Sequence, residues 1–110
     1  MEELNNLNDL CLKLTQAIKL MAKYGKELAE AEKNYKVALR QEALKLRSGD
    51  MAVTLIDKVV YGTPEVADKR FKRDTAEAMY KTAQENINVL KVQIRVLENQ
   101  IKLDWSKNEQ

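Results

Sequence analysis

The apolar residues between Ala83 and Ile101 constrain the fold of this chain more than any other feature. They follow one another in steps of four, three, four, three and four. This spacing is typical of the seam of an α-helix that packs lengthwise on a second helix. The pattern specifies architecture and carries no chemistry. The seam residues are Ala83, Ile87, Leu90, Ile94, Leu97 and Ile101.

A heptad pattern in the first half of the chain predicts a partner helix over residues 4–47. Gly49 is expected to end this helix, because glycine is the preferred residue just beyond a helix C-terminus. Two carboxylates, Glu32 and Glu42, interrupt the apolar frame. The frame consists of Leu4, Leu7, Cys11, Leu14, Ile18, Met21, Gly25, Leu28, Tyr35, Leu39 and Leu46.

A short helix is predicted over residues 51–61, because apolar residues recur there at i,i+4 spacing. Asp50 is expected to cap this helix, and Gly62 to end it. The run Val59–Tyr61 also has strand propensity, so a short strand or an irregular turn is the competing interpretation.

The last helix is predicted over residues 64–105. Thr63 suits the N-cap position and Pro64 the first helical position. No glycine or proline follows Pro64 in the chain, so nothing in the sequence breaks the helix. We therefore expect one domain that spans residues 1–110.

Two long helices joined by a short connection are expected to fold back as an antiparallel hairpin. In the predicted register Gly25 faces Leu90 and Tyr35 lies near Tyr80. The predicted fold class is all-α, a coiled-coil-like hairpin of two long helices with a short helical segment at its tip.

A single seam does not account for all the apolar residues of the two helices. A helix that is apolar over a wide arc is usually covered on two sides. We therefore expect the open end of the hairpin to associate as a homodimer that forms a four-helix bundle, whereas scattered surface apolar residues are the alternative. The predicted dimer interface comprises Leu10, Ala17, Leu20, Tyr24, Val89, Val92, Val96 and Leu103.

The inventory of reactive side chains argues against catalysis. The chain contains no histidine, so neither a histidine-based nucleophilic triad nor a histidine zinc site is available. Cys11, the only cysteine, lies on the predicted seam, where packing is the expected role. The glycines are too far apart for a phosphate-binding loop. We expect no enzyme activity, no cofactor and no metal.

Charge and hydropathy bear on the compartment and on the partner. The net charge of +2 gives no strong electrostatic drive toward nucleic acid. Residues 1–6 are acidic and polar, unlike a signal peptide, and no apolar run reaches the roughly 18–20 residues of a membrane span. These features predict a cytoplasmic protein without a membrane segment.

Basic residues gather where the hairpin is expected to turn, and phosphates are the obvious ligands of such a cluster. Asp68, Asp74 and Glu65 lie in the same stretch, so an ordinary solvated face is the alternative. Phe71 is expected to pack against the middle helix. This basic cluster comprises Arg40, Lys45, Arg47, Lys69, Arg70, Lys72 and Arg73.

The stretch Val66–Asp74, together with Ala83–Asn88 and Arg95–Ile101, resembles small all-helical proteins encoded by phages and prophages of Gram-positive bacteria. The resemblance covers about the last 40 residues, and those proteins are mostly of unassigned function. It implies a viral accessory protein made inside a bacterial cell, and it implies no catalytic residue.

Two functional hypotheses follow. In the first, the chain is an interaction module that binds and modulates or inhibits a host or phage protein, for example a defence nuclease, with the basic cluster as the favoured surface. In the second, it is a nucleic-acid-binding accessory factor in phage replication or recombination. Near-neutral charge favours the first.

Overall fold

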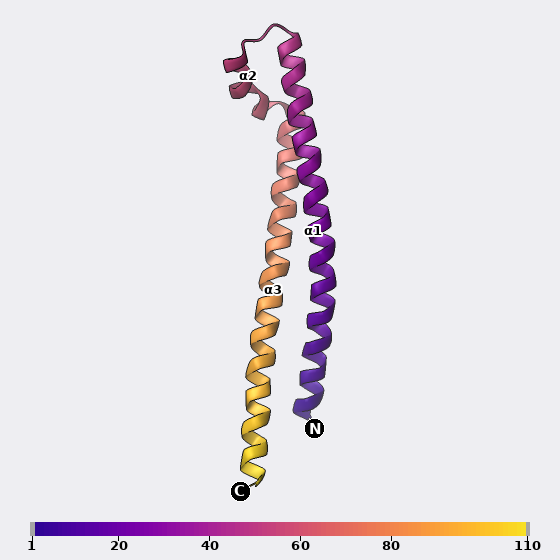
Figure 1. Cartoon of the computed structure of the whole chain (residues 1–110), viewed down its shortest axis with the longest axis vertical. Helices are drawn as coiled ribbons and strands as arrows, with labels where there is room; N and C mark the ends of the chain where they lie inside the picture. Colours follow the sequence, from indigo (N-terminus) through magenta and orange to yellow (C-terminus); the bar gives the residue numbers. More distant parts are fainter. Residues whose placement is uncertain (1, 110) are drawn as a thin grey trace. The chain divides into compact units, whose positions relative to one another are not determined.

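The computed structural model describes residues 2–109, and the side chains of residues 2–107. It consists of helix α1 (Glu2–Ser48), helix α2 (Val53–Val59), the 3₁₀ turn η1 (Val60–Gly62) and helix α3 (Pro64–Glu109) (Figure 1). No strand occurs among these residues, so the all-α prediction is confirmed. The strand alternative for the segment Val59–Tyr61 is wrong, because these residues end α2 and enter η1.

The long helices extend slightly beyond their predicted ends. Helix α1 begins at Glu2 rather than at residue 4, and Glu2 and Glu3 place negative charge in its first turn, where the helix dipole favours it. Helix α3 continues to Glu109 rather than ending at residue 105, because no helix-breaking residue interrupts it.

Asp50, not Gly49, is the left-handed residue that ends α1. Asp50 has φ of 65°, and no glycine has a positive φ among the described residues. Its backbone N–H donates to the Arg47 carbonyl (3.1 Å), and the Met51 N–H donates to the Leu46 carbonyl (3.2 Å). This pair of bonds is a Schellman motif. The motif places Asp50 one position beyond Gly49 because Met51 and Leu46 both pack against the same apolar cluster.

Helix α3 starts as the sequence predicts, whereas helix α2 does not. Ala52 is the N-cap residue of α2 and makes no side-chain capping bond, so the predicted capping role of Asp50 is wrong. Thr63 is extended and Pro64 is the first residue of α3. The Thr63 hydroxyl donates to the Val60 carbonyl (2.7 Å), which ties η1 to the start of α3.

The chain forms two compact units, and both are built from the same two long helices. Unit 1 comprises residues up to Lys23 together with those from Lys81 onward, and unit 2 comprises Tyr24–Tyr80. Helices α1 and α3 each contribute a segment to both units.

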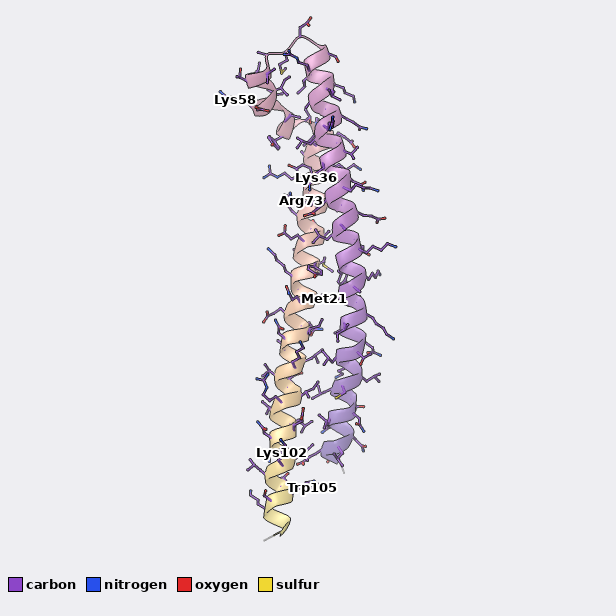
Figure 2. All side chains as sticks on the ribbon, in the orientation of Figure 1. Met21, Lys36, Lys58, Arg73, Lys102 and Trp105 are labelled. Carbon is purple, nitrogen blue, oxygen red and sulfur yellow. The ribbon has the colours of Figure 1, made fainter. Side chains whose placement is uncertain are left out.

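In unit 1 the α3 seam packs on α1 as the sequence predicts. Ile87 and Leu90 form a buried cluster with Ala17, and Met21 packs against it from α1 (Figure 2). Ala83 is also buried. The helix segments are antiparallel, since Leu97 lines a groove with Leu10 whereas Leu90 lines one with Ala17.

The predicted seam of α1 is wrong in unit 1 at Leu4, Cys11 and Ile18, whereas Leu39 and Leu46 of the same row pack against the core of unit 2. Cys11 and Ile18 are exposed, whereas Ala17 is buried and Leu10 packs against the core. A heptad seam has two apolar positions in every seven residues. Leu7 and Leu14 occupy one of them, and the second can lie either three or four residues further along the helix. These residues therefore fit two alternative frames, which we call the three-residue and the four-residue frame. In the middle of α1 the second position of the four-residue frame contains a charged carboxylate, Glu32, whereas that of the three-residue frame is apolar from Leu10 to Ala38 and is charged only near the helix ends, at Glu3 and Lys45.

The predicted register is also wrong. A side chain added at Gly25 would meet the ring of Tyr80 at 3.3 Å, so Gly25 faces a residue ten positions earlier than Leu90. Tyr35 lies under Arg73 rather than near Tyr80. The last turns of α1 pack against a cluster to which α2, η1 and the start of α3 all contribute, so they do not pair with α3 alone as the predicted register requires.

Unit 2 has a separate core around α2. Tyr35 of α1, Ile56 of α2, Val60 of η1 and Val66 of α3 form one buried cluster. The partly buried residues that pack against it are Leu39, Ala43, Leu46 and Met51. Val66 is fully buried at the start of α3. It makes the packing contact with the middle helix that the sequence predicts for Phe71.

Phe71 does not pack against α2. Its side chain is 69% exposed, because it projects from the outer side of α3, whereas Lys69 and Arg73 are the partly buried residues there.

Substitutions at Asp50 test the helix end. Asp50→Val should lower the free energy of unfolding by about 1–2 kcal/mol, because a β-branched residue is strained at positive φ. Asp50→Gly should be neutral or slightly stabilising, since glycine adopts this conformation freely. Urea unfolding followed by circular dichroism measures both. Equal losses from the two changes would contradict the Schellman geometry.

Two leucine truncations test the α3 seam. Leu90→Ala should destabilise unit 1 by about 2–4 kcal/mol, because this side chain is 7% exposed and its loss leaves a cavity. Leu12→Ala removes the same atoms from a side chain that is 59% exposed and should cost less than about 0.5 kcal/mol. The same urea experiment compares them, and similar losses would show that the seam is misassigned.

Candidate functional surfaces

A groove runs between α1 and α3 on one side of unit 1, and we call it the amide groove. Its main part has a volume of about 650 Å³, and Leu10 and Leu97 are apolar residues in its lining. A second hollow of about 280 Å³ adjoins it, since Lys13 lines both. Ala17 and Leu90 line this second hollow, so the groove follows the seam.

The polar lining of the amide groove is mostly uncharged. Asn6, Gln93 and Gln100 line the main part, and Asp9 and Lys13 are the charged residues there. Gln16 and Asn86 line the adjoining hollow. Primary amides both donate and accept hydrogen bonds, so this surface can pair with donors as well as with acceptors.

The structure separates the residues that the sequence assigns to a dimer interface. Leu10 and Ala17 pack in the seam within the chain and also line the amide groove. Tyr24 is half-buried in unit 2. Val92 and Val96 line the main part of the amide groove and Leu20 the second hollow. The exposed members of the predicted set are Leu20, Val89, Val92, Val96 and Leu103.

A second apolar surface lies on the other edge of the seam. Leu4, Cys11 and Ile18 are all exposed and recur at intervals of seven, so they share one edge of α1. We call these three residues the outer stripe. Sequence reasoning missed this surface because it placed them in the seam. Trp105 of α3 adds a large aromatic side chain that is 61% exposed (Figure 2).

The lysines of the basic cluster in unit 2 lie beside acidic partners. Lys72 Nζ is 3.2 Å from Asp68 Oδ2 and Lys45 Nζ is 3.1 Å from Glu42 Oε1. Lys69 Nζ lies 3.9 Å from Glu65 Oε1. These are mostly surface pairs that add little stability, but they reduce the positive field that a phosphate would meet.

Two arginines of the basic cluster lie over aromatic rings. The Arg73 guanidinium is 4.7 Å from the ring centre of Tyr35, between α3 and α1 (Figure 2). It also donates to Asp74 Oδ1 (2.7 Å), and this hydrogen bond raises the pKa of Arg73 above its ordinary value. Arg70 lies 5.9 Å from the ring centre of Tyr61. Arg40 and Arg47 are exposed.

Two carboxyl groups meet near the end of unit 1. A hydrogen bond with Asp104 raises the pKa of Glu3, and desolvation and the charge of Asp104 act in the same direction. Gln100 Nε2 donates to Asp104 Oδ1 (3.3 Å).

The Glu3–Asp104 pair predicts a pH dependence for the stability of unit 1. Because the pKa of Glu3 is higher in the folded chain, stability should rise as pH falls through that raised value. Glu3→Gln should therefore raise the melting temperature at pH near 7 and lose this advantage below the ordinary pKa of 4.5. Circular dichroism melts across pH measure the difference.

Glu2→Gln is the matched control, because it removes the same charge from the same helical turn. Both variants lose the favourable interaction with the helix dipole, so only Glu3→Gln relieves the contact with Asp104. Identical melting shifts in the two variants at every pH would contradict the pairing.

No family model, curated protein or solved structure matches this chain. Within residues 2–109 no three His, Cys, Asp or Glu side chains gather in a way that would hold a metal ion. No helix in that range is both long and apolar enough to cross a membrane. The candidate surfaces are therefore the amide groove, the outer stripe and the basic cluster.

Proposed function

We propose that this chain is a non-enzymatic interaction module that binds and modulates another protein through the outer stripe of unit 1. The observation that carries the proposal is the ratio of exposed to buried apolar residues in this unit. The buried ones are Ala17, Ala83, Ile87 and Leu90. The large apolar side chains that are exposed there are Leu4, Leu12, Ile18, Leu20, Val89, Val92, Val96, Leu103 and Trp105.

The arrangement of the outer stripe supports a binding role over random surface exposure. Single exposed apolar residues are normal, but Leu4, Cys11 and Ile18 recur on one edge of a helix. On α3, Lys91 and Glu98 each come one residue after a seam residue, Leu90 and Leu97. They therefore lie on the edge of the seam that carries the outer stripe. An apolar stripe beside charges is the composition of a non-obligate protein interface.

The basic cluster supports a protein partner more than a nucleic acid. Its lysines lie beside carboxylates of the same chain, and Arg73 is held between Tyr35 and Asp74. Release of phosphate counterions drives most nucleic-acid binding, and it requires cations that are free to contact phosphates. The net charge of +2 also gives little long-range attraction.

The resemblance to small helical phage proteins suggests the setting for this function. A phage or prophage accessory protein acts in the bacterial cytosol, and its target would be a host or phage protein such as a defence nuclease. A rigid helical surface can inhibit such a target by covering its working face, which requires no catalytic group.

Affinity capture tests the proposed surface. The tagged chain and its Ile18→Glu variant would be expressed in a Gram-positive host, and the retained proteins quantified by mass spectrometry. We expect a defined partner to be retained by the wild type and reduced at least about tenfold by the variant, because a buried unpaired charge costs more than about 1.4 kcal/mol.

Lys19→Glu is the matched control, since it introduces the same carboxylate at the neighbouring exposed position, outside the stripe. It should retain the partner. Equal retention by all three proteins would contradict the outer stripe. Salt-dependent binding to DNA, lost when Arg40 and Arg47 are replaced, would favour the nucleic-acid function instead.

A further inference from the structure

The amide groove carries both the projections and the recesses of an interhelical contact. Val96, at its edge, is 62% exposed, and Val92 and Leu20 are exposed beside it. The floor is formed by seam residues such as Leu97. Helices associate when apolar side chains of one surface enter the recesses of another. A surface that has both features complements a copy of itself.

The charged residues of the main groove are also complementary to those of a second copy. Asp9 and Lys13 are its charged lining residues, one of each sign, and they lie four residues apart on α1. In a contact with two-fold symmetry, every pair occurs twice: if one residue of the first copy touches another residue of the second copy, the same two residues also meet with the copies exchanged. A two-fold axis that brings Asp9 of one copy to Lys13 of the other therefore forms two ion pairs.

The exposed area leaves room for an interface of standard size. The chain exposes 8415 Å², whereas a folded monomer of 12.7 kDa typically exposes about 6,200 Å². This excess belongs to the whole chain and reflects how little surface two-helix packing buries, and the roughly 800 Å² that each partner buries in a standard interface fits within it.

We propose that the amide groove of unit 1 binds a second copy of this chain. Each copy inserts Val92, Val96 and Leu20 into the groove of the other, and the α1 and α3 segments of both copies form four-helix packing. Gln93 and Gln100 of one copy find amide partners in the other, since amides both donate and accept. The outer stripe lies on the other edge of the seam and stays free in the dimer.

Sedimentation and light scattering test the association at micromolar concentration. The wild type should have twice the mass of one chain, and Val96→Glu and Leu20→Glu should each weaken the association at least about tenfold. Ile18→Glu and Leu12→Glu place the same charge outside the groove and should leave the dimer intact. A wild-type monomer, or a dimer that dissociates only with Ile18→Glu, would overturn the proposal.

A charge-exchange experiment keeps the test decisive even if a groove substitution disturbs folding. Asp9→Lys gives a groove with two cations, and Lys13→Asp gives one with two anions. Each variant alone should dimerise less well than the wild type at low salt, and an equimolar mixture should recover the mass of the dimer. No recovery in the mixture, with both variants helical by circular dichroism, would overturn the two-fold pairing.

Failure of this proposal is distinguishable from failure of the proposed function. The groove variants change the mass of the complex that the chain forms with its own copies, whereas Ile18→Glu changes the amount of a different protein that the chain retains. A monomeric wild type that still retains its partner through the outer stripe would remove the dimer alone.

Discussion

The seam between α1 and α3 is the interaction on which the rest of the structure depends. Two helices in contact bury only a narrow strip of each, and in unit 1 this strip includes Ala17 and Ala83, which contribute little apolar area. Small residues let the helices approach closely, but they leave the flanking Val, Leu and Ile side chains in water. The exposed faces of unit 1 therefore follow directly from the thinness of its core.

Unit 2 solves the same problem differently, because a third helical segment covers its seam. Ile56 and Val60 supply apolar area from α2 and η1, and Val66 becomes fully buried between them and α1. The hydrogen bonds at Asp50 and Thr63 fix where the chain enters and leaves this segment. The basic cluster lies on α1 and α3 of the same unit, and several of its cations contact carboxylates and aromatic rings of the same chain.

The two proposals use different edges of one seam. The amide groove has amides and one charge of each sign, which suits a copy of itself, whereas the outer stripe is bordered by charged residues that suit a separable partner. A module of this kind needs no reactive group. Its selectivity would come from the shape of two rigid helices and from the positions of a few exposed side chains.

The sequence by itself determined the helices, their approximate ends and the α3 seam, because heptad spacing and the positions of Gly and Pro act locally. Only the tertiary structure decided which α1 residues face α3. Leu7, Leu14 and Met21 fit two frames, and the choice of Ala17 over Ile18 depends on how closely α3 approaches. The register likewise required the position of α2, since Ala43 and Leu46 pack against a cluster that includes Ile56 of α2 as well as Val66 of α3. Contacts between segments distant in sequence therefore set the surfaces, and the local pattern set the helices that carry them.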